Sequence, residues 1–145
     1  MKKTFFAYLF LGISALTIAS CEKNNPINNP PPVNIADMIA GNPEFSMMES
    51  AIVRSGLETQ IRNAPDITFF LADNAAFQNA GIDQTYLDNL SVDDLTALVL
   101  YHEVDHSINS SEFPLGDTIT TVSNLHVFSN VNDNGIYING IRIKT

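Results

Sequence analysis

Cysteine is nearly absent from this chain, and positive charge is scarce. A single cysteine, Cys21, occurs among 145 residues, so the chain cannot form a disulfide framework. Basic residues number 7 against 16 acidic residues. An acidic surface repels phosphate backbones and anionic headgroups, so the composition argues against nucleic acid as a partner and against a basic membrane-binding patch.

The sequence also lacks an apolar run of the roughly 20 residues that a membrane-spanning helix needs. The longest candidate, Phe5 to Ala19, is shorter and follows Lys2 and Lys3, which is the form of a secretion signal. No phosphate-binding glycine loop, Ser-His-Asp constellation or internal repeat is present. We therefore expect one exported domain without a cofactor.

The end of this signal, Ile18-Ala19-Ser20-Cys21, looks like a bacterial lipobox, in which the cysteine is lipidated and becomes the first mature residue. We predict a lipoprotein signal peptide at residues 1–20 and membrane attachment through a lipid on Cys21. The mature part has 125 residues, enough for one domain. The expected location is the cell envelope, at the outer membrane or cell surface.

Residues 21–32 are predicted to form a lipidated tether. After Cys21 the segment reads EKNNPINNPPP, with four prolines and no hydrophobic period. In a polyproline conformation of about 3.1 Å per residue it holds the following domain roughly 30 Å from the lipid. Residues 33–145 then form a single domain.

The first part of that domain carries helix signals. Asn34 can cap "IADMIA", Pro43 suits the first position of a second helix, and Ser91 with Asp94 forms a capping box. Helical spacing turns two groups of side chains toward the core: Phe45, Met48 and Ile52, then Leu95, Leu98, Val99 and His102.

Strand signals follow His106. The short alternating runs "TITTV", "LHVFSNV", "GIYI" and "IRIKT" favour antiparallel strands, with tight turns at Asn134-Gly135 and Asn139-Gly140. The pattern Asn130-x-Asn132-x-Asn134-Gly135 also mimics a calcium loop. A full site fails, because its twelfth position falls on Ile141 instead of an acidic residue. The order of elements predicts an α+β fold.

Residues 67–77, ITFFLADNAAF, pass from a strand directly into a helix start. Ile67 to Leu71 is a five-residue apolar run that favours a strand covered on both faces. Asp73 ends the run, and its carboxylate can accept hydrogen bonds from the free N–H groups of a helix that begins at Asn74.

Two later segments join this one in a fixed order: LVLYHEV at Leu98–Val104 and IYINGIRI at Ile136–Ile143. Together the three resemble the fasciclin domain, an extracellular adhesion and interaction module. The first segment departs from the family at Ala72, where proline is usual, and at Asp73, where a hydroxyl residue is commoner. The matching positions are Thr68, Phe70, Asn74, Ala76 and Phe77, the Tyr-His pair Tyr101 and His102, and the Asn-Gly pair Asn139 and Gly140.

The resemblance implies helices packed on an antiparallel β-sandwich and a non-catalytic module that binds protein or polysaccharide partners. In the resembled family the Tyr-His region is linked to adhesion, which makes Tyr101 and His102 candidate binding residues. A Tyr and a His that end an apolar helix usually bury their rings and hydrogen-bond backbone groups. We therefore expect Tyr101 and His102 to support folding more than binding.

An alternative function, a small lipoprotein zinc hydrolase, follows from the H-E-x-x-H motif at residues 102–106. On a helix, His102 and His106 would share one face for zinc, with Glu103 as the general base. The resemblance instead ends the helix near His102 and sends Glu103 to Asp105 into a strand. The charge of Asp105 is also unusual in such a motif. No third ligand stands out among Glu112, Asp117 and His126, so we predict neither a metal site nor an enzyme.

The resembled family continues beyond its Asn-Gly segment with a second Asn-Gly and a closing strand, whereas this sequence stops at Thr145. We therefore expect the domain at residues 33–145 to be C-terminally incomplete, with "IRIKT" at an open sheet edge. Unpaired edge N–H and C=O groups invite pairing with another chain, which predicts homo-oligomers.

Overall fold

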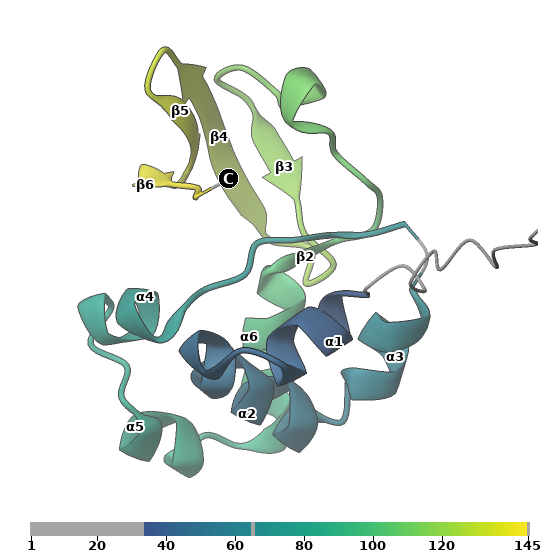
Figure 1. Cartoon of the computed structure of the whole chain (residues 1–145), viewed down its shortest axis with the longest axis vertical. Helices are drawn as coiled ribbons and strands as arrows, with labels where there is room; N and C mark the ends of the chain where they lie inside the picture. Colours follow the sequence, from purple (N-terminus) through teal and green to yellow (C-terminus); the bar gives the residue numbers. More distant parts are fainter. Residues whose placement is uncertain (1–33, 65, 145) are drawn as a thin grey trace, which may run out of the picture. The chain divides into compact units, whose positions relative to one another are not determined.

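The computed structural model describes residues 34–64 and 66–144. The predicted signal peptide, Cys21 and the tether therefore lie outside the described residues. Within the described ranges, helices come first along the chain and strands predominate after them (Figure 1). None of the helices described there has both the length and the apolar character needed to cross a membrane.

Six α-helices make up the helical layer, and three of their starts are capped as the sequence predicts. The side chains of Asn34, Asp73 and Ser91 each accept a hydrogen bond from the backbone N–H three residues further on. The helices are α1 (Ile35–Ala40), α2 (Ser46–Ser55), α3 (Glu58–Asn63), α4 (Asn74–Asn79), α5 (Gln84–Asn89) and α6 (Val92–Tyr101), with 3₁₀ turns η1 (Pro43–Phe45) and η2 (Ser110–Glu112).

The helix predicted to start at Pro43 begins three residues later. The side chain of Asn42 accepts a hydrogen bond from the N–H of Glu44, but the residues after it form only the turn η1. Helix α2 itself starts at Ser46. A local cap and a proline can thus initiate a single 3₁₀ turn, whose tighter geometry does not continue far.

The start of α2 is capped by Asn74, which belongs to α4. The local N-cap residue of α2, Phe45, makes no side-chain cap bond. Instead Asn74 Oδ1 accepts from the N–H of Met47 at 3.0 Å, while Asn74 Nδ2 donates to Pro43 O and Ser46 Oγ, each at 3.0 Å. The first motif therefore joins α4 to α2.

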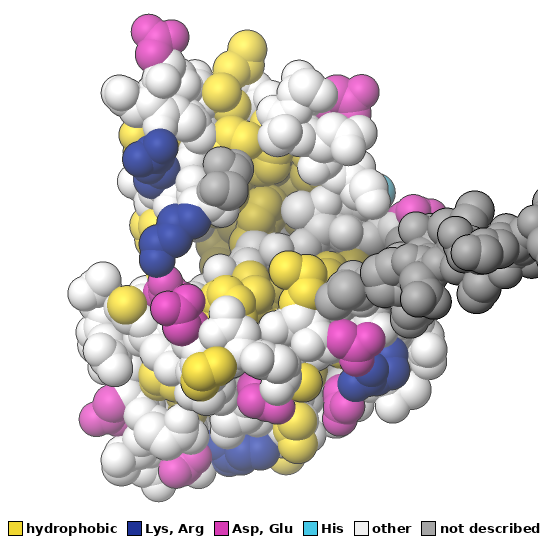
Figure 2. Space-filling view, in the orientation of Figure 1, with side chains coloured by type: hydrophobic (Ala, Val, Ile, Leu, Met, Phe, Trp, Pro, Cys, Tyr) yellow, Lys and Arg dark blue, Asp and Glu magenta, His cyan; other side chains and the backbone are white. Residues whose placement is uncertain are grey.

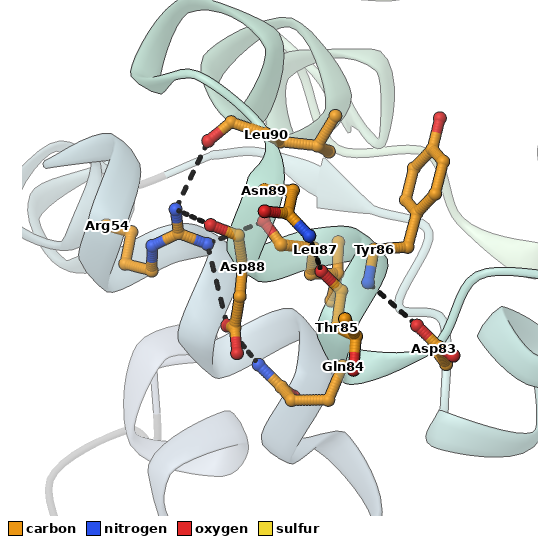
Figure 3. A network of polar contacts seen from close by, with 9 residues as sticks. All are labelled: Arg54, Asp83, Gln84, Thr85, Tyr86, Leu87, Asp88, Asn89 and Leu90. Carbon is orange, nitrogen blue, oxygen red and sulfur yellow. Dashed lines mark hydrogen bonds and ion pairs between the residues drawn. The ribbon is translucent and has the colours of Figure 1, made fainter.

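Arg54, in the last turn of α2, caps the C-terminal end of α5 in the same way. Its guanidinium donates to the carbonyl oxygen of Leu87 at 2.7 Å and to those of Asp88 and Leu90 at 3.2 Å (Figure 3). The last carbonyls of a helix lack intrahelical partners and carry partial negative charge, so a cation there satisfies and stabilises them.

A first hydrophobic core fills the helical layer between α2 and α6. The predicted core residues Met48, Ile52, Leu95 and Val99 are buried there, and Phe45 and Leu98 pack against them while partly exposed. His102, the last member of the predicted stripe, is only half-buried. The helical spacing read from the sequence therefore identifies most of this core.

The four predicted strands form one antiparallel sheet in the order β3-β4-β5-β6. They are β3 (Thr118–Thr120), β4 (His126–Asn132), β5 (Gly135–Ile138) and β6 (Ile141–Arg142). The turn predicted at Asn139-Gly140 is confirmed, because both residues have positive φ, 49° and 81°. The turn predicted at Asn134-Gly135 lies one residue earlier, since Gly135 already pairs with Asn132 and begins β5 with a φ of 131°.

The strand predicted from Ile67 to Leu71 is wrong in its length and burial. Only β1 (Thr68–Phe69) forms, antiparallel to β2 (Glu103–Val104), and both β1 residues are half-buried instead of covered on both faces. The reason is the partner: α6 ends at Tyr101 and the chain bends after Val104, so the partner strand is only two residues long, and Phe70 adds a single bond, from its N–H to His102 O.

The β1–β2 ribbon lies between the helical layer and the four-stranded sheet (Figure 1). Phe69 packs into the helical core, whereas Phe70 and Val104 join a second core. That second core also contains Phe113, Ile119, Val127 and Ile136, and apolar side chains can be followed from the sheet toward the helices in Figure 2. The predicted α+β fold is confirmed. One sheet of the expected sandwich is reduced to the β1–β2 ribbon, and the buried residues form two hydrophobic cores.

Candidate functional site

The candidate residue Tyr101 touches the third motif. Asn139 Nδ2 donates to the Tyr101 hydroxyl at 3.0 Å, and Asn139 Oδ1 accepts from the N–H of Phe128 at 2.8 Å. Asn139 therefore bridges the end of α6 and strand β4 from the turn between β5 and β6. Because Asn tolerates positive φ, one side chain serves both the turn and this bridge.

His102 touches the first motif. His102 is the C-cap of α6, and its Nδ1 lies 2.8 Å from the carbonyl oxygen of Leu98. Because a carbonyl oxygen can only accept a hydrogen bond, Nδ1 carries the hydrogen. The ring stacks on Phe69 with centroids 6.4 Å apart, and the His102 carbonyl accepts from the N–H of Phe70 at 2.8 Å. Burial lowers the pKa of the imidazole and favours its neutral form. These contacts hold α6 against the ribbon.

The H-E-x-x-H segment is not helical. Helix α6 ends at Tyr101, before His102, and Glu103 and Val104 form β2. His106 lies beyond the strand, with its Nδ1 2.9 Å from an Asp105 carboxylate oxygen. The two imidazoles therefore do not share a helical face. Within residues 34–64 and 66–144, no group of three His, Cys, Asp or Glu side chains is arranged to hold a metal ion.

Glu103 is buried, which the sequence pattern did not predict. Its exposed fraction is 3%, and Oε2 has no hydrogen-bond partner in the described part of the chain. Because Glu103 is paired with Phe69 across the ribbon, its side chain shares the face of Phe69, toward the helical core. Burial raises the pKa of the Glu103 carboxyl.

Asp73 forms a second link between the helices and the end of the sheet. One carboxylate oxygen accepts from the N–H of Ala76 at 2.7 Å, and the other lies 2.6 Å from Lys144 Nζ, just beyond β6. The bond to Lys144 and the bond from Ala76 lower the pKa of the Asp73 carboxyl. Asp73, where the sequence departs from the family pattern, thus retains the cap and gains an ion pair.

A cleft of about 590 Å³ lies beside β3. Residues 118–122 line it together with residues of the segment after β2, among them Asp105, His106 and Glu112. Among the described lining residues there are two carboxylates and no Lys or Arg. In the sequence, Glu112 was considered only as a third zinc ligand. The sequence could not show this cleft, because the loop after β2 reaches β3 through tertiary packing.

Replacing Tyr101 with phenylalanine is expected to lower the free energy of unfolding by about 1 kcal/mol. The variant keeps the ring but loses the hydroxyl that accepts from Asn139, and one hydrogen bond contributes about 0.5–1.5 kcal/mol. Urea unfolding measures the difference. Tyr86→Phe is the matched control, because Tyr86 is 52% exposed and should show no change. Equal stability of Tyr101→Phe and the native chain would contradict the structural role.

Residues 43–145 match the family model of the Fasciclin domain. The matched range contains all three motifs described above, at residues 67–77, 98–104 and 136–143. No curated protein matches the sequence.

Proposed function

The chain belongs to the fasciclin domain family, and from that premise we propose that it is a lipid-anchored interaction module of a bacterial cell envelope. Fasciclin domains are generally adhesion or interaction modules and are typically non-enzymatic. The module holds a protein or polysaccharide partner at the outer membrane or cell surface and performs no chemistry on it.

The observation that carries this proposal is the family match over residues 43–145. The geometry at the H-E-x-x-H segment supports the non-catalytic part. A zinc hydrolase needs both imidazoles and the glutamate around one water molecule. Here the segment is not helical, so His102 and His106 do not share a helical face, and Glu103 shares the face of Phe69 toward the helical core. The residues of the motif serve the junction of α6 with the ribbon.

The non-catalytic reading is tested by zinc content and hydrolysis. After dialysis, the chain is expected to retain no stoichiometric zinc, and peptide substrates should remain uncleaved when zinc is added. A hydrolytic activity that is lost in Glu103→Gln would contradict the proposal and restore the zinc hydrolase. Envelope polysaccharides and proteins, offered separately to the immobilised chain, then test whether either class is retained.

Replacing Cys21 with alanine is expected to abolish lipid labelling. Acylation needs the thiol, and the lipobox-like sequence places the only cysteine of the chain at the predicted cleavage site. The experiment follows incorporation of a labelled fatty acid in cells and the size of the protein. The variant should accumulate as an unlabelled, unprocessed precursor.

Ser20→Ala is the matched control, because it keeps a small residue before the cysteine and should be labelled and cleaved as the native chain is. Unchanged labelling and processing of Cys21→Ala would show that the lipoprotein assignment is wrong. Fractionation of the envelope in the same cells then locates the labelled protein.

A further inference from the structure

Within residues 34–64 and 66–144, strand β3 has one edge without backbone partners, and this edge ends at Val122, whose N–H donates to Glu103 O at 2.8 Å. On its other edge, Ser129 N–H donates to Asp117 O and Thr121 N–H donates to Leu125 O, both at 2.8 Å. Partners in an antiparallel pair alternate between bonded and non-bonded positions, so the N–H and C=O of Thr118 and Thr120 point away from β4. The N–H of Thr118 is bound by the Asp117 carboxylate, but the Thr120 groups have no backbone partner within the described ranges.

The 590 Å³ cleft lies along this free edge, because residues 118–120 are among those that line it. A residue of an added strand occupies about 4.8 Å across the sheet, about 10 Å through its thickness and about 3.3 Å along the strand. The product of these lengths is a volume of about 160 Å³ for each residue. The cleft therefore has room for about three to four extended residues, which matches the three-residue length of β3.

The lining selects the charge of an occupant. Asp105 and Glu112 are among the residues that line the cleft, and the described lining contributes no Lys or Arg. His106 Nδ1 lies 2.9 Å from Asp105 Oδ1, and Asn109 Nδ2 donates to Glu112 Oε2 at 3.1 Å, so each carboxylate keeps a second oxygen that no described side chain engages. The chain as a whole is also acidic, with 16 acidic and 7 basic residues. A basic side chain facing these carboxylates would be favoured, and an acidic one repelled.

We propose that this cleft binds an extended basic peptide segment of a protein partner, which adds as a strand to the free edge of β3. Main-chain bonds to the carbonyl oxygen of Thr118 and to the N–H and C=O of Thr120 supply affinity, and Lys or Arg at alternate positions face Asp105 and Glu112. This site rests on the proposed function and narrows its partner to protein. Lipid labelling at Cys21 is independent of it, so the anchor and the peptide site can fail separately.

The test titrates the full chain in detergent with fluorescein-labelled, end-blocked hexapeptides and follows anisotropy. A peptide of alternating Val and Lys is expected to bind saturably, and more weakly as salt rises. Its counterpart with Glu in place of Lys should not bind. A third peptide, N-methylated at every residue, keeps the charge but loses all of its main-chain donors, and it should also fail to bind.

Variants of the chain locate the site. The double variant Asp105→Asn/Glu112→Gln is expected to weaken binding of the Val-Lys peptide about tenfold, as the loss of two partly screened ion pairs implies. Asp93→Asn/Asp133→Asn removes the same charge at exposed positions elsewhere and should bind as the native chain does. Thr120→Pro removes the N–H that faces the cleft, and an edge strand tolerates proline at such a position, so this variant should lose binding. Thr120→Val keeps the N–H and should still bind.

Three results would overturn the proposal. Equal weakening by both double variants would mean that the peptide binds by overall charge. Equal binding of the N-methylated peptide would exclude strand addition, a conclusion that holds even if Thr120→Pro fails to fold. The Val-Lys peptide could also fail to bind while the chain retains a neutral envelope polysaccharide. If Asp105→Asn/Glu112→Gln abolished that retention, the cleft would belong to a different class of partner.

Discussion

Replacing Glu103 with glutamine is expected to raise the free energy of unfolding at neutral pH by about 1 kcal/mol or more, because an ionised group costs more to bury than a neutral polar group and glutamine removes only the charge. Glu103 is 3% exposed and its Oε2 has no described partner, so the charged form is the costly one. Glutamine has nearly the same shape and cannot ionise, so it removes the charge while the side chain keeps its place.

The pH dependence follows from the direction of the pKa shift. Burial raises the folded-state pKa of Glu103 above its unfolded value, so between the two values the folded chain binds more protons than the unfolded chain. Stability therefore falls as pH rises through that window, and the penalty is complete above the folded-state pKa. The advantage of Glu103→Gln should shrink as pH falls and vanish below the unfolded pKa.

Urea unfolding at a series of pH values measures this difference. Asp133→Asn is the control, because it removes a carboxylate that is exposed in the turn before β5. If Glu103→Gln proved less stable than the native chain at neutral pH, Glu103 would have to be a carboxylate with a stabilising partner.

The second large effect is expected from Asn74→Ala, which should lower the free energy of unfolding by about 2–4 kcal/mol. The cap on Met47 contributes about 1 kcal/mol, and the bonds to Pro43 O and Ser46 Oγ about 0.5–1.5 kcal/mol each. The three bonds join α4 to η1 and to the start of α2, which packs against α6. Their loss should therefore loosen the helical core.

Two further variants separate this tertiary cap from ordinary helix effects. Asn79→Ala, at an exposed position of the same helix, should change stability by less than about 0.5 kcal/mol. Asn74→Asp keeps an oxygen that can accept from Met47 and should recover part of the loss. Thermal and urea unfolding would both report these differences. An Asn74→Ala variant as stable as Asn79→Ala would show that α2 needs no cap from α4.

These contacts also bear on where a partner can bind. Asn74, Tyr101, His102 and Asn139 all lie in the family motifs, and each of them joins elements that are distant in the sequence. Each of them makes at least one side-chain hydrogen bond within the chain. The cleft beside β3, in contrast, has an unpaired strand edge and exposed carboxylates, so it is a better position for recognition than the Tyr-His pair.

Elements whose cause lies within a few residues could be predicted from the sequence. Asn34, Asp73 and Ser91 cap helices because each oxygen reaches an N–H only three residues away. The turn at Asn139-Gly140 follows from the backbone freedom of those two residues. The three motifs, read in order, also identified the fasciclin family, and hence the α+β class and the general kind of function.

Other features depend on which distant segments meet, and only the tertiary structure decided them. Asn74 caps a helix that starts 28 residues before it, and Glu103 is buried because its two-residue strand lies over the helical core. The strand predicted from Ile67 to Leu71 shortened for lack of partner backbone. The β3 cleft exists because the loop after β2 lies beside that edge. A periodic pattern reports which face of an element is apolar, but burial, pairing and charge at a site depend on the neighbour that the fold supplies.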